Sequence, residues 1–318
     1  MANDQDDTAE LPIPHHEADP AAREPAGASS RVSVDVAALT HAGKVRKNNE
    51  DHYIVTRFDR TMRTLLTNLP AGTVPDRYAE TVYGMLVADG VGGAAAGEIA
   101  SRTAITAIMD LVIDTPDWIM RLDDPLAKEV MKRMEDRFQK VRDVLVALAK
   151  KDPTLGGMAT TMTLAASLGP ELLIAHVGDS RAYAVQGGEL RRLTRDQTMA
   201  QSLADAGAIT PDEVAKHPSR HVLTGALATR GAFAHVQLHR ARLDDGDQLL
   251  LCSDGLTEMV PEDAIARALR KPGPSSDACR ALVDLALEAG GKDNVTVVLG
   301  RYKIPKQATA PKNQPPGA

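Results

Sequence analysis

Acidic residues stand at the ends of apolar, strand-length runs, and this placement limits what the chain can fold into more than any other feature. The run "YGMLVA" ends at Asp89, "LLIAHVG" at Asp179 and "LLLCS" at Asp254, while Asp293 immediately precedes "NVTVVL". Glu50 and Asp51 follow the strand-like start of "GKVRKNNED". Because a carboxylate at the tip of a buried strand is costly to desolvate, it needs positive charge nearby. Few Lys or Arg residues flank these acids, so the sequence predicts a hard divalent cation, Mg²⁺ or Mn²⁺.

An Asp-Gly pair taken singly is also the commonest hairpin turn. Asp245-Gly246, which stands before an apolar run, is interpreted as such a turn, and so is Gly187-Gly188. Asp89-Gly90 and Asp254-Gly255 instead end apolar runs and precede small residues and helix formers. A glycine at position 90 also lets a backbone carbonyl approach a cation. The conjunction of the acids, rather than any one pair, predicts the metal site.

Arg46 lies four residues before Glu50 and has two interpretations. Its guanidinium could clamp a phosphate through two hydrogen bonds. It could equally be a surface cation beside Lys44 and Lys47, and the spacing alone leaves both open.

Between about residues 32 and 302, strand-like and helix-like segments alternate. Apolar runs at 32–36, 81–90, 160–168, 171–179, 247–255 and 294–300 predict strands. Apolar stripes of helical period in 97–113, 126–148 and 275–289 predict helices that face a core. Strands with few long helices between them favour a layered packing with two sheets over a strict βαβ order. Residues 1–30 and 304–318, rich in Ala, Pro and polar residues, are predicted to be disordered tails, and His15 and His16 are interpreted as solvated tail residues.

Composition narrows the class of protein. Aromatic residues make up only 3% of the chain, so the core must be largely aliphatic. A formal net charge of −6 without a long basic run argues against nucleic acid as a partner. Two cysteines, Cys252 and Cys279, fit a reducing compartment, and no signal-like, lipidation or membrane-spanning segment is evident. The expected location is the cytoplasm, away from membranes.

Taken in order, seven stretches resemble the metal-dependent protein phosphatase family, also called protein phosphatase 2C, in its bacterial form. They are "GKVRKNNED" (43–51), "VADGVGGAAAGEIAS" (87–101), "MATTMTLA" (158–165), "AHVGDSRAY" (175–183), "LTRDQT" (193–198), "LLLCSDGLTEMV" (249–260) and "GKDNVTVVL" (291–299). Each stretch taken alone is weak to moderate evidence for the family. Together the seven stretches follow the family's order and approximate spacing.

The resemblance implies an α+β fold, a four-layer α-β-β-α sandwich of two antiparallel sheets with a metal centre in the cleft at one end. The catalytic domain would span residues 31–303, with a flap at about 197–227 beside the active site. The implied activity is hydrolysis of phosphoserine and phosphothreonine by a hydroxide that bridges two metal ions about 3.5–4 Å apart. The expected cofactors are two Mn²⁺ or Mg²⁺ ions, with a third, weaker site.

The resemblance also implies roles for individual residues. Asp89 would bridge both metals, Asp254 and Asp293 would complete one site, Glu50 and the Gly90 carbonyl would complete the other, Asp51 would hold a metal-bound water, Asp179 would join Asp254 at the third site, and Arg46 would bind the substrate phosphate. The expected partners are phosphorylated proteins, a serine/threonine kinase or its targets among them, acted on by a monomer.

The chain departs from the family pattern in several places. Val91 stands where many eukaryotic members have a His proposed as general acid, and Gln197 stands where Asp-His is common. Residues 57–81 form a longer segment than expected and are interpreted as an extra surface loop. His217 and His221, in the flap, are interpreted as structural or substrate-facing rather than as metal ligands.

Four alternative functions were compared with the sequence: two other phosphatase mechanisms, a binding protein without turnover, and a phosphatase with a different substrate. A cysteine phosphatase needs Arg six positions after its Cys, but Glu258 and Leu285 stand there, and no P-loop is present. An enzyme that forms an aspartyl-phosphate needs an Asp-x-Asp pair directly after a strand, whereas Asp245 and Asp247 come before a predicted strand. A pseudophosphatase, which binds phosphoproteins without turnover, would be expected to lose a metal ligand. A phosphatase of a partner-switching anti-sigma antagonist would differ only in substrate.

Overall fold

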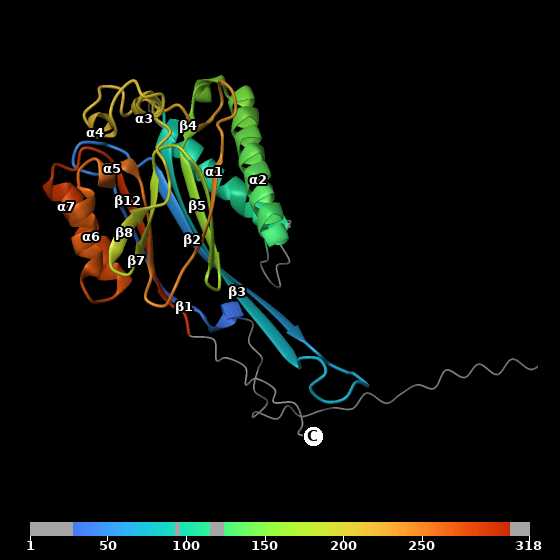
Figure 1. Ribbon diagram of the computed structural model, residues 1–318. Coiled ribbons are helices and arrows are strands. Elements are labelled where there is room, and N and C mark those ends of the chain that lie inside the picture. The colour runs from blue at the N-terminus through green and yellow to red at the C-terminus, as the bar shows by residue number, and fades with distance from the viewer. Residues whose placement is uncertain (1–27, 93–95, 115–123, 306–318) are drawn as a thin grey trace, which may run out of the picture.

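The computed structural model describes residues 28–92, 96–114 and 124–305. In Figure 1 two antiparallel sheets stack against each other, with helices on both outer sides. The predicted tails, apart from residues 28–30 and 304–305, lie outside the described residues, as do His15 and His16. Within the described ranges, no helix combines the length and apolarity that crossing a bilayer requires.

The first sheet has the strand order β1-β12-β11-β7-β8. Its strands are β1 (Ser33–His41), β12 (Val295–Lys303), β11 (Gln248–Cys252), β7 (Arg181–Gln186) and β8 (Glu189–Arg192). Two helices, α6 (Glu262–Arg270) and α7 (Ser275–Glu288), pack their apolar faces on its outer side. The last of the predicted helical stripes is thereby confirmed as core-facing.

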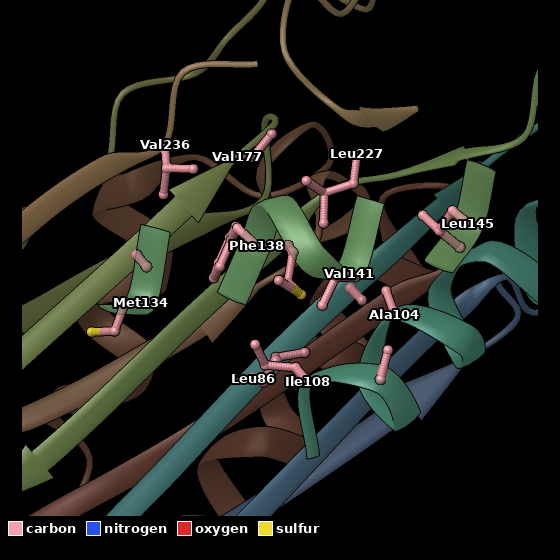
Figure 2. Packing of buried hydrophobic residues seen from close by; sticks show 14 of the residues in the cluster. Leu86, Ala104, Ile108, Met134, Phe138, Val141, Leu145, Val177, Leu227 and Val236 are labelled. Atoms are coloured by element: carbon pink, nitrogen blue, oxygen red, sulfur yellow. The ribbon is translucent and has the colours of Figure 1, made fainter. Parts of the chain in front are cut away.

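The second sheet has the order β10-β6-β5-β3-β4-β9, with β2 paired to β3. Its strands are β2 (Asp51–Arg63), β3 (Arg77–Val91), β4 (Ala159–Thr160), β5 (Met162–Leu168), β6 (Glu171–Val177), β9 (Leu227–Ala228) and β10 (Gln237–Arg242). Helices α1 (Ala96–Asp114) and α2 (Asp124–Lys151) cover its outer face. Figure 2 shows the contact, where Phe138 and Val141 of α2 lie over Leu86 of β3 and Ala104 and Ile108 of α1.

Strands in the middle of the sandwich are apolar on both faces because each face meets a different layer. On β3, Leu86 packs under α1 and α2, whereas its neighbour Met85 points into the space between the sheets. On β11, Leu250 packs under the α6–α7 pair and Leu251 lies between the sheets. Alternation along a strand sends successive side chains to opposite faces. The continuous apolar runs are therefore explained, and the predicted α-β-β-α sandwich is confirmed.

The remaining elements are short. They are the 3₁₀ helices η1 (Ala28–Arg31) and η2 (Pro153–Leu155) and the helices α3 (Met199–Asp205), α4 (Pro211–Val214) and α5 (Asp254–Thr257). Helices α3 and α4 lie in the segment predicted to be the flap. The described structure begins before the expected boundary at residue 31, since Ser29 is buried and its hydroxyl accepts a hydrogen bond from the Thr81 amide.

Three local predictions were wrong. Residues 57–81 are not mainly a loop, because β2 and β3 pair from Asp51↔Asp89 to Arg63↔Arg77 and leave only 64–76 unpaired. For the same reason Glu50 immediately precedes a strand and Asp51 begins it, instead of both following one. Asp245-Gly246 is not a hairpin turn, because β10 before it and β11 after it belong to different sheets. Gly187-Gly188 does close the β7–β8 hairpin, with φ of 57° and 84° as a two-residue turn requires.

Replacing Phe138 by alanine is expected to lower the free energy of unfolding by about 3–5 kcal/mol, because it empties a fully buried site between α2 and the sheet. Urea denaturation of the two proteins would measure the difference. Val144→Ala, on the same helix but 41% exposed, is the matched control and should change stability by less than about 0.5 kcal/mol. Equal effects of the two substitutions would contradict this packing.

Candidate metal centre

The β2–β3 pair places two carboxylates opposite each other. Asp51 and Asp89 are direct partners in the strand register. Asp51 is buried, and its Oδ2 accepts a hydrogen bond of 2.7 Å from the Ser253 hydroxyl. Its Oδ1 is buried and has no hydrogen-bond partner within the described part of the chain. A buried carboxylate oxygen left open in this way indicates a missing ligand or solvent partner.

Three further acids meet this pair because antiparallel neighbours bring strand ends and strand starts to one edge. Asp254 follows β11, Asp179 follows β6, and Asp293 stands two residues before β12. Together they line a cleft of about 760 Å³. Of the predicted site residues, those that line it are Arg46, Glu50, Asp89, Gly90, Asp179, Asp254 and Asp293. Asp51 lies behind the lining, and the predicted residues are thus brought together at one end of the fold.

The acids of the cleft raise one another's pKa. Burial raises the pKa of Asp89 well above its ordinary value, and the charges of Asp51 and Asp254 raise it further. Burial also raises the pKa of Asp254, and the charge of Asp179 raises it further. The pKa of Asp51 rises to about 6 and that of Asp179 to about 7, in both cases mainly through burial. So much unbalanced negative charge fits a site built for cations with oxygen ligands.

Arg46 reaches the same cleft from the loop before β2. Its Nη2 donates a hydrogen bond of 2.6 Å to Asp293 Oδ2, which raises the pKa of the guanidinium. The side chain is 57% exposed. The structure places Arg46 at the cleft, and its role in binding phosphate stays a prediction.

Gly90 and Gly97 permit the close approach of α1 to the end of β3. A Cβ at position 90 would lie 2.1 Å from the Gly97 carbonyl oxygen, and one at position 97 would lie 2.3 Å from Glu50 Oε2. A side chain at position 90 would require a backbone shift, and one at position 97 would displace the Glu50 carboxylate. The glycines therefore let the start of α1 lie against the end of β3 and leave room for the Glu50 carboxylate at the start of α1.

Several residues that hold the site were not predicted. Asn294 Oδ1 accepts a hydrogen bond from the Glu50 amide at 2.7 Å, while its Nδ2 donates to the Ala42 and Asn48 carbonyls. Thr161 accepts from the Asp89 amide through its hydroxyl at 3.1 Å. The only sign of Asn294 in the sequence was its position as a polar residue next to Asp293, a predicted site residue.

The family departures receive structural explanations. Gln197 holds the loop before Asp179, because its Oε1 accepts from the Gly178 amide and its Nε2 donates to the His235 carbonyl. Val91 lies at the cleft, 39% exposed, and has no proton to donate.

The two flap histidines differ in their surroundings. His217 accepts a hydrogen bond from the Ser219 amide, as a structural residue would. His221 pairs with Glu258 at the cleft. Ligand atoms of His221, Asp254 and Glu258 lie within 4.8 Å of one another, an arrangement that could hold a metal ion.

Comparison with known proteins agrees with this geometry. The family model described as "Protein phosphatase 2C" matches residues 76–286. The serine/threonine protein phosphatase PstP of Mycobacterium tuberculosis is 37% identical over 72% of this chain, but the match spans only 43% of PstP. The serine/threonine phosphatase stp of Listeria innocua is 30% identical over 82% of this chain and 92% of its own length.

Solved structures show the same fold. The crystal structure of the M. tuberculosis phosphatase PstP/Ppp has a TM-score of 0.68 at 34% identity, covering 84% of this chain and 98% of that one. The catalytic domain of PstP in complex with two manganese ions has a TM-score of 0.66 at 32% identity, covering 86% and 99%. With the family model matched over most of the domain and the sandwich shared, the chain belongs to the protein phosphatase 2C family.

Proposed function

We propose that the protein is a metal-dependent phosphatase that hydrolyses phosphoserine and phosphothreonine in other proteins. The observation that carries the proposal is the cleft itself, where largely half-buried carboxylates, whose charges raise one another's pKa, lie beside an exposed arginine. The relatives' names, serine/threonine phosphatases, support the same substrate class.

The donor set fits hard divalent cations. In our proposal Asp89 would contact both ions, Asp254 and Asp293 would help to hold one of them, and Glu50 with the Gly90 carbonyl would help to hold the other. Oxygen donors of this kind are preferred by Mn²⁺ and Mg²⁺, and the PstP catalytic domain binds two manganese ions. When bound, two such ions activate water as a nucleophile and neutralise charge on a phosphoryl group. Asp179 and Asp254, with His221 and Glu258 nearby, are proposed to hold a third ion.

The other residues of the cleft are proposed to bind the substrate phosphate and to orient a water molecule. Arg46 is proposed to hold the substrate phosphate, with Asp293 positioning its guanidinium. Ser253 fixes one oxygen of Asp51, so that the open Oδ1 can accept a hydrogen bond from a water in the cleft. Since Val91 cannot donate a proton, we propose that water protonates the leaving alkoxide.

The substrates we propose are phosphorylated proteins, among them a bacterial serine/threonine kinase or its targets, acted on by a monomer. A cytoplasmic location is proposed as well, supported by two free, buried cysteine thiols.

Hydrolysis of p-nitrophenyl phosphate and of a phosphoserine peptide, each with Mn²⁺, with Mg²⁺ and with EDTA, tests the proposal. Turnover of both that needs metal is the expected result. A folded protein without turnover under any of these conditions would favour a phosphoprotein-binding pseudophosphatase instead.

Replacing Arg46 by alanine is expected to lower kcat/KM for the phosphopeptide by about 10²-fold, because a charge-assisted contact to the phosphoryl group is lost. Steady-state kinetics in Mn²⁺ would measure it. The control is Arg57→Ala, which removes an equally exposed arginine that pairs with Asp59 on β2. Arg46 would have no role in phosphate binding if both variants kept the wild-type rate.

A further inference from the structure

Gln197, at the start of the predicted flap, is hydrogen-bonded to the loop that carries one of the cleft acids. Its backbone amide donates to the Gly178 carbonyl at 2.8 Å, and the Gly178 amide donates to Gln197 Oε1 at 3.1 Å. The side-chain Nε2 donates to the His235 carbonyl at 2.7 Å. Because a backbone amide only donates and a carbonyl only accepts, these partners fix the orientation of the side chain. Gln197 therefore uses both the acceptor and the donor of its amide.

The other end of the flap meets the same residue. The Thr224 and Gly225 amides donate to the Gln197 carbonyl at 2.8 Å and 3.3 Å. A Cβ at position 225 would lie 1.8 Å from Gln197 Oε1, so a glycine is needed for the side chain to pass. Next to this junction the Met199 amide donates to the Val222 carbonyl at 2.8 Å. The two ends of the flap are thus joined at Gln197.

Gly178 is in turn packed against the partner of a second cleft acid. It directly precedes Asp179, and its φ is +117°. A Cβ at position 178 would lie 2.5 Å from the Thr161 Cβ. The Thr161 amide donates to the Asp89 carbonyl at 2.8 Å, and the Thr161 hydroxyl accepts from the Asp89 amide at 3.1 Å. A shift of Gly178 would therefore move Asp179 and press on the residue that holds Asp89.

The flap end that Gln197 holds also reaches the cleft. His221 and Leu223, which come just before Thr224, line the cleft together with Asp179 and Asp254. A protein substrate extends beyond its phosphate and would meet these flap side chains. p-Nitrophenyl phosphate has little outside the phosphate that could reach them.

We propose that Gln197 is a positioning residue for the reaction, which holds Asp179 and the cleft-lining end of the flap in place through the donor and acceptor of its side chain. The inference rests on the proposed phosphatase function. A misplacement of about 1 Å in an active site can cost up to about 10²-fold in rate. A neutral histidine, the residue common at this position in the family, also offers one acceptor and one donor and could fill the same role.

Kinetics of three variants in Mn²⁺ test this role. Gln197→Met keeps the length of the side chain but removes the amide, and should lower kcat for p-nitrophenyl phosphate and for a phosphoserine peptide by about tenfold. KM should rise for the peptide alone. Gln197→His, assayed at pH 8 where an imidazole of ordinary pKa about 6.5 is neutral, should keep most of the activity. Gln201→Met, which removes a flap glutamine bonded to Asp205 within α3, is the control and should behave as the wild type.

Hydrogen exchange of the metal-free protein in EDTA gives a second readout that needs no turnover. In Gln197→Met the amides of Gly178, Thr224 and Gly225 should exchange faster, while the strands of both sheets exchange as in the wild type. A wild-type protein without turnover would contradict the proposed function, and the exchange measurement would still test the role of Gln197.

Three results would overturn the positioning role. The first is a Gln197→Met protein with wild-type kinetics. The second is a Gln197→His protein as slow as Gln197→Met, since the donor and acceptor would then not be what matters. The third is faster exchange throughout both sheets in Gln197→Met, which would show that Gln197 only stabilises the fold.

Discussion

Replacing Asp89 by asparagine is expected to lower kcat/KM in Mn²⁺ by about 10³-fold or more. Asp89 lies at the centre of the carboxylate cluster, and four other acids raise its pKa. In the proposed mechanism it is the ligand shared by both ions, so its loss weakens both sites and the electrostatic stabilisation that they supply. The amide is almost the same size, which should leave the fold intact.

The same substitution should leave the metal-free protein at least as stable as the wild type, because it removes one of several repelling charges. Urea denaturation in EDTA would measure this, beside phosphatase assays in Mn²⁺. Asp110→Asn, an exposed position on α1, is the control and should change neither quantity. An Asp89→Asn enzyme within about tenfold of the wild-type rate would contradict a bridging role.

In EDTA, the free energy of unfolding is expected to fall as the pH rises from about 4 to about 7. The ordinary pKa of an aspartate is near 3.8, whereas that of Asp51 is about 6 and that of Asp179 about 7 in the folded protein. Between these values the folded state binds more protons than the unfolded state, so stability decreases with rising pH. The raised pKa values of Asp89 and Asp254 act in the same direction. We expect a loss of about 3 kcal/mol or more over this window.

Saturating Mn²⁺ is expected to reverse this trend, because ions compete with protons for the same carboxylates and bind better as the pH rises. An ion present at 100 times its dissociation constant stabilises the folded state by about 2.7 kcal/mol per site. Denaturation curves at pH 5, 6.5 and 8, with EDTA and with Mn²⁺, would measure both effects. If the stability of the metal-free protein stayed constant or rose over this pH range, the acids of the cleft would not have the raised pKa values on which this prediction rests.

Much of the fold followed from periodicity. The helical stripe at 126–148 became α2, and the apolar runs before Asp89 and Asp254 became β3 and β11. β2 was missed because its outer half, "TRFDRTMR", is charged and exposed, so that no apolar run marks it. Asp245-Gly246 was assigned to a hairpin because a turn's local chemistry does not tell which sheet the next strand joins.

The acids of the site could be predicted because each ends or begins a buried strand. The residues that position them could not, since their partners lie far away in sequence. Asn294 is 244 positions from Glu50, and Ser253 is 202 positions from Asp51. The pairing of Arg46 with Asp293 is equally remote, and no local pattern in either segment encodes it.

The pairing of β1 with β12 has a consequence for synthesis of the protein. The first and last strands described are neighbours, from Ser33↔Lys303 to His41↔Val295, and Asp293 and Asn294 enter the site just before β12. On the ribosome the early strands can pair as they emerge, yet the five-stranded sheet lacks β12, the strand that joins β1 to β11, until about 300 residues have been made. A nascent chain therefore cannot assemble the phosphatase centre, and activity begins only when the finished domain is free to close.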